Sequence, residues 1–222
     1  MNETFALVRL ILAAALPLLA AFIWFKARRT PITLPWFVLS LVAGMLSLLL
    51  AARLQQLLPL VIRGTGRFSI FLDILARIAL LEELSRLAIL FPILRIIDRA
   101  RTRDLAFYTS LGLVLGLGFA MLENALYGLA NINITLIRAF TAAPLHGACA
   151  TRVAAGLYFR KEQPVRALLS FFTAVFIHAA YNMTIAGAVL HSSFALLIAL
   201  TALLSIVPYL RFSEGRECKE RK

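Results

Sequence analysis

The sequence is poor in cysteine and histidine, which limits the kinds of site that it can build. It has two cysteines and three histidines in 222 residues. Cys149 lies within an apolar segment and Cys218 within a basic tail, so the two cysteines have neither metal-ligand spacing nor the pattern of a disulfide framework. The sequence also lacks His-Glu-x-x-His, which excludes the familiar zinc signature that a single helix carries.

Charged residues are also scarce, and their scarcity excludes an ordinary soluble domain. Only 15% of the residues are charged, whereas 61% are hydrophobic and the mean hydropathy is +0.87. Soluble globular domains are about 45 to 50% apolar. Because apolar segments of about 20 residues recur between short basic connections, the sequence predicts one integral membrane domain, an all-α polytopic bundle of transmembrane helices.

We expect about seven spans, which fall into three parts of this one domain. Residues 1–67 form two spans and an interfacial connection, residues 68–190 form the helices that carry the polar motifs, and residues 191–222 form the last span and a basic tail. The third span is longer than a bilayer requires and must tilt, kink or protrude. The first six spans are expected at about 5–25, 34–52, 68–97, 105–129, 136–159 and 167–190, and the seventh runs to about 210.

The excess of basic residues predicts membrane orientation rather than nucleic-acid binding. The net charge is +12, but the 23 Lys and Arg residues lie mostly in the short connections. In a seven-span topology the connections on one side hold 15 of them and those on the other side hold only Arg53, Arg63 and Arg67. The positive-inside rule then predicts an outside N-terminus and a cytoplasmic C-terminus. We expect contact with the lipid bilayer and none with nucleic acid; no oligomeric state is predicted.

One stretch places charges inside a segment that is otherwise apolar enough to span a membrane. Glu82 and Glu83 are adjacent carboxylates, and Arg86 follows them. An ionised side chain near the bilayer centre costs on the order of 2.5 to 3.5 kcal/mol on insertion scales, so paired acids there predict a functional site. Arg86 lies four residues after Glu82 and can neutralise it, which makes Glu83 the better candidate for a general base. The alternative is an ion pair that only holds helices together.

Three further polar residues fall within separate predicted helices. Glu123, His146 and His178 can meet the acid pair at mid-depth, as in polar sites built inside helical bundles. Arg138 lies two helical turns before His146, and Asn182 lies four residues after His178, so each shares a face with its histidine. We expect Arg86, Arg138 and Asn182 to orient these groups rather than to react.

Two kinds of hydrolysis fit this set of residues. In the first, a buried glutamate acts as general base on water and then as acid, while histidine and Asn182 stabilise the oxyanion of a cleaved amide. In the second, His146, His178 and a glutamate such as Glu123 bind Zn²⁺ in an open three-ligand site, and another glutamate activates the water. The sequence supplies residues for both, so metal dependence is left open.

Four separated motifs follow one another between about residues 68 and 190. They are Glu82-Glu83-x-x-Arg86, Phe119-x-x-x-Glu123-Asn124-Ala125-Leu126-Tyr127, Arg138 followed by His146, and His178-x-x-Tyr181-Asn182. In this order they resemble the PrsW family of intramembrane proteases, which is distantly related to the type II CAAX prenyl proteases. The CAAX pattern has three residues between the acids and the arginine and a histidine in the second motif, so the PrsW branch fits better.

The resemblance implies a polytopic enzyme that hydrolyses a peptide bond in or next to a membrane protein substrate. In some members the cut is regulatory and falls in an anti-sigma factor, and the expected location is the plasma (inner) membrane of a prokaryote. The lysine that usually follows the acid pair is Arg86 here, which keeps the charge and adds a planar donor fork. Glu82, Glu83, Glu123, His146 and His178 are then the expected catalytic residues.

Two other functions are compatible with buried glutamate and histidine. A proton- or cation-coupled transporter would use them to relay protons or bind a cation, although the sequence shows no convincing repeat between its halves, as transporters commonly do. A catalytically inert relative would act as a binding or immunity protein. All motif residues are present, which favours the enzyme.

Overall fold

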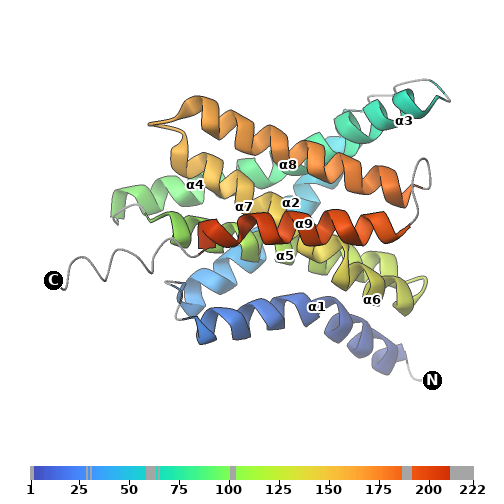
Figure 1. Ribbon diagram of the computed structural model, residues 1–222. Coiled ribbons are helices and arrows are strands. Elements are labelled where there is room, and N and C mark those ends of the chain that lie inside the picture. The colour runs from blue at the N-terminus through green and yellow to red at the C-terminus, as the bar shows by residue number, and fades with distance from the viewer. Residues whose placement is uncertain are drawn as a thin grey trace.

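A computed structural model describes residues 3–28, 30, 32–58, 64, 66–100, 104–186 and 192–210. These residues form helices and no strand, which confirms the predicted all-α class. Figure 1 shows the helices running side by side in one bundle. Their bounds are α1 (Glu3–Ala27), α2 (Leu34–Leu57), α3 (Arg67–Asp73), the π-helical segment η1 (Ile74–Ala79), α4 (Leu80–Ala100), α5 (Leu105–Gly128), α6 (Ile132–Phe140), α7 (Ala142–Phe159), α8 (Pro164–Ile185) and α9 (Ser192–Leu210).

Five of the described helices are long and apolar enough to cross a membrane, so the expected count of about seven is not confirmed. They are α1, α2, α5, α8 and α9. The helices α4 and α7 are not among them, because they carry charged and polar residues that lower their hydropathy. The chain is an integral membrane protein, and the start of α1 and the end of α9 lie at opposite ends of the bundle (Figure 1).

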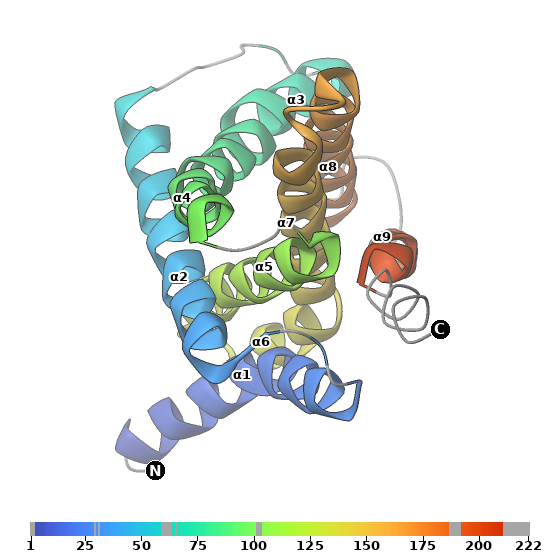
Figure 2. The same ribbon diagram turned by 90° about the vertical axis from the view of Figure 1, so that its left-hand side faces the viewer.

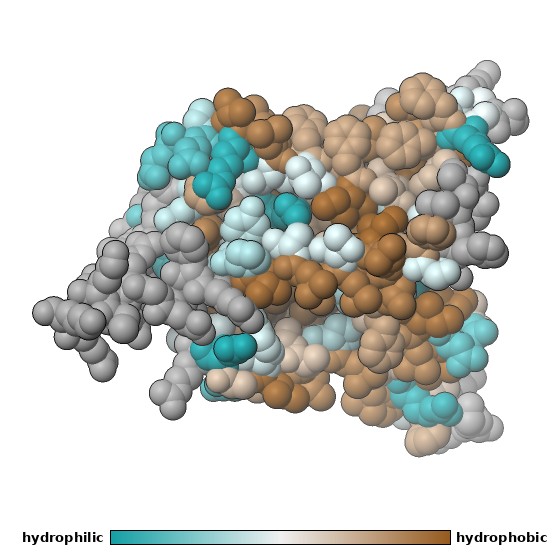
Figure 3. All heavy atoms as spheres, viewed as in Figure 1, coloured by the Kyte–Doolittle hydropathy of each residue, from teal (hydrophilic) through white to brown (hydrophobic). Residues whose placement is uncertain are grey.

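The surface of the bundle is suited to lipid. Large hydrophobic side chains are exposed along α1, α2, α8 and α9, for example Leu12, Leu49, Leu169 and Leu204. On the face drawn in Figure 3, hydrophobic residues form broad areas across the middle, interrupted left of centre by residues of intermediate and hydrophilic character, and other hydrophilic residues gather toward the two ends. A soluble protein rarely exposes so large an apolar surface.

The prediction of one continuous span over residues 136–159 was wrong, because the chain breaks at Thr141. The short helix α6 ends at Phe140, and α7 begins at Ala142. Pro144 is compatible with the break, since its ring would clash with the carbonyl four residues earlier in a continuous helix but is tolerated in the first turn of α7. The Thr141 hydroxyl donates to the Ile137 carbonyl and accepts from the Tyr181 hydroxyl, both at 3.0 Å, which ties the break to α8.

The long third span is one continuous helical run, in which the π-helical segment η1 joins α3 to α4. At its end the Leu80 N–H donates to the Leu75 carbonyl, five residues earlier, so this stretch is wound more loosely than an α-helix. The segment ends at Ala79, three residues before Glu82. The span thus changes its winding shortly before the acid pair, and the expectation that it tilts, kinks or protrudes stays a prediction.

The helices α5 and α7 form the centre of the bundle. Figure 2 shows α5 surrounded by the other helices, and every residue of α5 from Leu105 to Ala120 is buried. Glycines let α7 approach closely: a Cβ atom built at Gly112 would lie 2.6 Å from the Ala150 carbonyl oxygen, and one at Gly116 would collide with the carbonyl of His146. Small residues commonly permit such contacts between membrane helices.

Two segments with sequence-based expectations lie outside the described residues. They are the basic tail, 211–222, which contains Cys218, and residues 59–63 and 65 of the expected interfacial connection after α2. The predicted direction of the chain across the membrane stays a prediction.

We expect Gly112→Ala to destabilise the bundle by about 1 to 3 kcal/mol, because the added methyl group must displace the α7 backbone. The measurement is the free energy of unfolding in detergent, compared between the variant and the wild type. Gly66→Ala is the matched control, since a Cβ atom there meets nothing within 4 Å. Equal stability of the two variants would contradict the close approach.

Candidate active site

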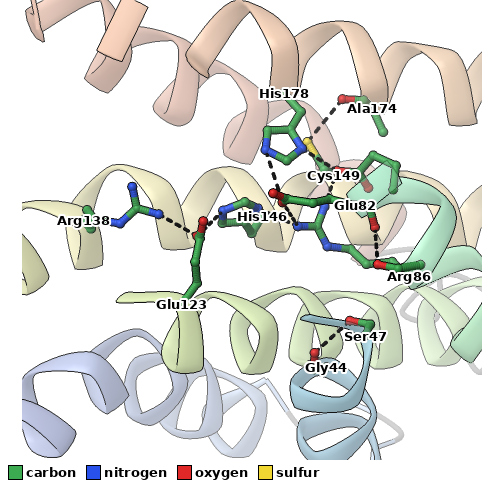
Figure 4. Close-up of polar contacts among 12 residues, drawn as sticks. Gly44, Ser47, Glu82, Arg86, Glu123, Arg138, His146, Cys149, Ala174 and His178 are labelled. Carbon is green, nitrogen blue, oxygen red and sulfur yellow. Dashed lines mark hydrogen bonds and ion pairs between the residues drawn. The ribbon is translucent and has the colours of Figure 1, made fainter. Parts of the chain in front are cut away.

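Five helices bring the polar residues of the motifs to one place in the bundle interior. Glu82, Glu83 and Arg86 come from α4, Glu123 from α5, Arg138 from α6, His146 from α7 and His178 from α8. Figure 4 shows side chains of this cluster directed toward one another from their separate helices. The sequence predicted that these residues meet, and in the structure their side chains lie together.

Arg86 lies at the centre of the cluster and is fully buried. Its Nη1 pairs with Glu83 Oε1, and its Nη2 donates to Glu82 Oε2 at 3.1 Å. The same Nη2 lies 2.8 Å from His146 Nδ1. Sequence spacing had paired Arg86 with Glu82 alone, whereas the planar guanidinium reaches both acids and a histidine on another helix. A buried charge needs such partners, because an unpaired one is strongly destabilising.

The face of the Arg86 guanidinium is covered by an aromatic ring. The Arg86 Cζ atom lies 3.9 Å from the centroid of Phe119, whose ring centroid is 5.1 Å from that of His146. A cation over an aromatic face is attracted by the ring quadrupole. Phe119 therefore packs inside the site and does not face lipid.

His178 is held in one orientation by the acid pair. Its Nδ1 lies 2.9 Å from Glu83 Oε1, and a carboxylate can only accept, so Nδ1 carries the proton and donates it. In a neutral ring the lone pair is then on Nε2, which lies 3.6 Å from Glu82 Oε2. A carboxylate that orients a histidine in this way is a common partner of metal-binding imidazoles.

His146 bridges the two halves of the cluster. A guanidinium only donates, so the contact with Arg86 makes His146 Nδ1 an acceptor and places the ring proton on Nε2. That Nε2 lies 3.0 Å from Glu123 Oε2, to which it donates. The rings of His146 and His178 meet edge to face, with centroids 4.9 Å apart.

Glu123 and Arg138 form the part of the cluster that is open to the outside. Arg138 Nη2 donates to Glu123 Oε2 at 2.5 Å, and Arg138 Nε donates to Asn124 Oδ1 at 2.8 Å. The Tyr127 ring supports the guanidinium, with the Cζ atom 4.1 Å from its centroid. The side chains of Glu123 and Arg138 are 15% and 14% exposed, whereas those of the acid pair, Arg86 and the two histidines are exposed by 7% at most. Water or a peptide would therefore reach the cluster at this edge.

Three of these residues could hold a metal ion. Ligand atoms of Glu82, His146 and His178 lie within 4.8 Å of one another, and all three residues are buried. One carboxylate and two imidazoles make an open three-ligand set that suits Zn²⁺. Buried Glu83 Oε2 has no hydrogen-bond partner among the described residues, so this oxygen beside the three residues is still able to accept a hydrogen bond or contact a cation. The sequence had suggested Glu123 as the third ligand, but the structure groups Glu82 with the histidines.

Two residues of α5 hold Arg138 although the sequence indicated no role for them, and the role expected of Asn182 stays a prediction. Asn124 and Tyr127 hold Arg138, and their spacing one and four residues after Glu123 places them on the same turn of α5. That spacing could have indicated that the two residues act together, but the sequence does not show that they contact Arg138. Asn182 is half-buried one turn after His178, and among the described residues its side chain makes no hydrogen bond.

Comparison with known families places the chain. The family described as PrsW family intramembrane metalloprotease matches residues 32–210, which include every residue of the cluster. Neither the curated proteins nor the solved structures give a match. The match covers most of the chain and all four motifs. The chain therefore belongs to the PrsW family and is a membrane protease of that family.

Proposed function

We propose that the protein is a metal-dependent endopeptidase that cleaves a peptide bond of a membrane protein substrate within or beside the bilayer. The observation that carries the proposal is the grouping of Glu82, His146 and His178 from three helices, with ligand atoms within 4.8 Å. The orientation of His178 by Glu83 supports it, because it directs an imidazole lone pair toward Glu82. The family match supports peptide hydrolysis.

A metal ion held by Glu82, His146 and His178 would act as a Lewis acid, polarising the scissile carbonyl and activating water. The protein itself supplies a buried setting in which electrostatic interactions are stronger than in water. Glu83 is a positioning residue in this proposal, because its carboxylate is fully buried between Arg86 and His178. This assignment replaces the sequence-based choice of Glu83 as general base.

Glu123 is better placed to act as general base. Its side chain lies at the exposed edge of the cluster and contacts His146 Nε2, so it is beside both the entering water and a proposed ligand. It would accept a proton from the attacking water and pass it to the leaving nitrogen. Arg138 would keep the Glu123 carboxylate oriented without exchanging a proton itself, since guanidinium stays charged.

The substrate is proposed at the level of chemical class. An apolar outer surface and a polar interior suit a membrane protein substrate that reaches the site from the bilayer. The regulatory role that some family members have, cleavage of an anti-sigma factor, stays a prediction for this chain. The alternative functions are a coupled transporter and an inert binding protein, and the next experiment distinguishes them from a protease.

We expect wild-type protein purified in detergent to contain one zinc ion per chain and to cleave a candidate single-span membrane protein. His146→Ala should lose both, because a ligand is removed. Glu123→Gln should keep the zinc and lower the cleavage rate by about 10²- to 10⁴-fold, the usual contribution of a general base. Metal analysis and gel-resolved cleavage are measured on the same samples.

Asp73→Asn is the control for loss of a carboxylate, because Asp73 pairs with Arg77 near the start of the third span, away from the cluster. It should keep both zinc and activity. Robust cleavage by wild-type protein without metal would replace the proposal with a glutamate-dependent mechanism. If the wild-type protein neither contained metal nor cleaved the substrate, the transporter and the inert binding protein would be the functions that fit.

We expect Glu83→Gln to weaken zinc binding by about 10- to 100-fold, since it removes the charged partner that orients His178. Cleavage by this variant should recover when zinc is raised to saturation. The dependence of the cleavage rate on free zinc measures both effects. If saturating zinc restored nothing, Glu83 would have to take part in the reaction itself.

A further inference from the structure

Arg86 donates a hydrogen bond to the lone pair of His146 that a metal ion would need. A neutral imidazole has one lone pair and one N–H, and His146 uses both: Nδ1 accepts from Arg86 at 2.8 Å, and Nε2 faces Glu123 at 3.0 Å. A metal ion binds imidazole only through a lone pair. In this arrangement the lone pair of His146 is committed to Arg86.

The conflict does not depend on which nitrogen would bind the metal ion. If the ligand is Nδ1, Arg86 must leave that atom. If the ligand is Nε2, the ring proton must move to Nδ1, where it would point at a guanidinium that can only donate. In both cases the hydrogen bond between Arg86 and His146 has to break before His146 can serve as a ligand.

Arg86 also contacts Glu82, although a carboxylate has further lone pairs, so here the guanidinium competes through its charge and its position rather than by using up the acceptor. Its Oε2 accepts from Arg86 Nη2 at 3.1 Å, and the same oxygen lies 3.6 Å from His178 Nε2. A single atom, Arg86 Nη2, therefore contacts two of the three proposed ligands. The positive charge of the guanidinium, which is fully buried beside them, also opposes the approach of a cation.

We propose that Arg86 competes with the metal ion for Glu82 and His146, so that this side chain sets the metal affinity of the site. The inference rests on the proposed metal-dependent function. When the ion binds, Nη2 gives up its two contacts, while Nη1 keeps Glu83 and the guanidinium stays over the Phe119 ring. Glu83 would thus keep its cation when Nη2 is released, and the bound metal ion would neutralise Glu82.

Lysine at this position would compete less effectively. Its ammonium is a compact charge without the planar fork that lets Arg86 contact Glu82, Glu83 and His146 together. Compared with lysine, arginine therefore stabilises the metal-free cluster more and lowers the affinity of the site for the metal ion.

The test is the zinc affinity of the full-length protein in detergent, measured by competition with a chromophoric chelator. Arg86→Gln should bind zinc about 10- to 100-fold more tightly than the wild type, because a charged hydrogen bond to the ligands no longer has to be broken. Arg86→Lys should show a smaller increase in affinity. Arg152→Gln, which removes an arginine of α7 that bonds to Ser205, should bind zinc as the wild type does.

A second readout is the thermal unfolding midpoint after chelation and after addition of zinc. With chelator, Arg86→Gln should unfold at a lower temperature than the wild type, because the acid pair has lost its cation, and zinc should raise its midpoint by more than it raises that of the wild type. If Arg86→Gln does not fold, the affinity of Arg86→Lys decides.

Zinc affinity that is unchanged or lower in the Arg86 variants would overturn the inference and make Arg86 a residue that only assembles the ligands. A different result tests the proposed function: if wild type and both Arg86 variants bind no zinc, the metal-dependent mechanism itself fails. The two failures are distinguishable because the first requires measurable zinc binding by the wild type.

Discussion

The structure depends on the neutralisation of charge inside an apolar bundle. Three carboxylates, Glu82, Glu83 and Glu123, face two guanidinium groups, Arg86 and Arg138. With neutral imidazoles the cluster keeps one excess negative charge, which water cannot screen well in a buried site. Five helices must therefore stay in register to satisfy these groups, and the excess charge makes the same place attractive to a cation.

Much of the site could be predicted from the sequence, because charges in apolar segments are costly and so mark the places where function maintains them. The adjacent acids Glu82 and Glu83, and single polar residues on other segments, indicated a common site before any fold was known. Their pairing could not be predicted. Sequence spacing relates residues of one helix, whereas the contact of Arg86 with His146 depends on how α4 and α7 pack.

The helical class followed from composition, but the local interruptions did not. Apolar length predicted a single span where the chain has α6 and α7, although Pro144 carried the signal for a break. The interruption matters for the site: α6 turns Arg138 toward Glu123, while α7 carries His146 deeper into the bundle. The π-helical segment before Glu82 had no such sequence signal; it packs against α8, a contact that the sequence does not show.

The position of Glu123 along α5 has a consequence for how water is supplied. Glu123 lies five residues before the end of its helix, a rise of about 7.5 Å. The open edge of the cluster is therefore close to one end of α5, and if that end lies at a boundary of the hydrocarbon layer, hydrolysis would not require a channel through the whole bilayer. A substrate helix would need to unwind only near its end, where its peptide groups can exchange internal hydrogen bonds for water.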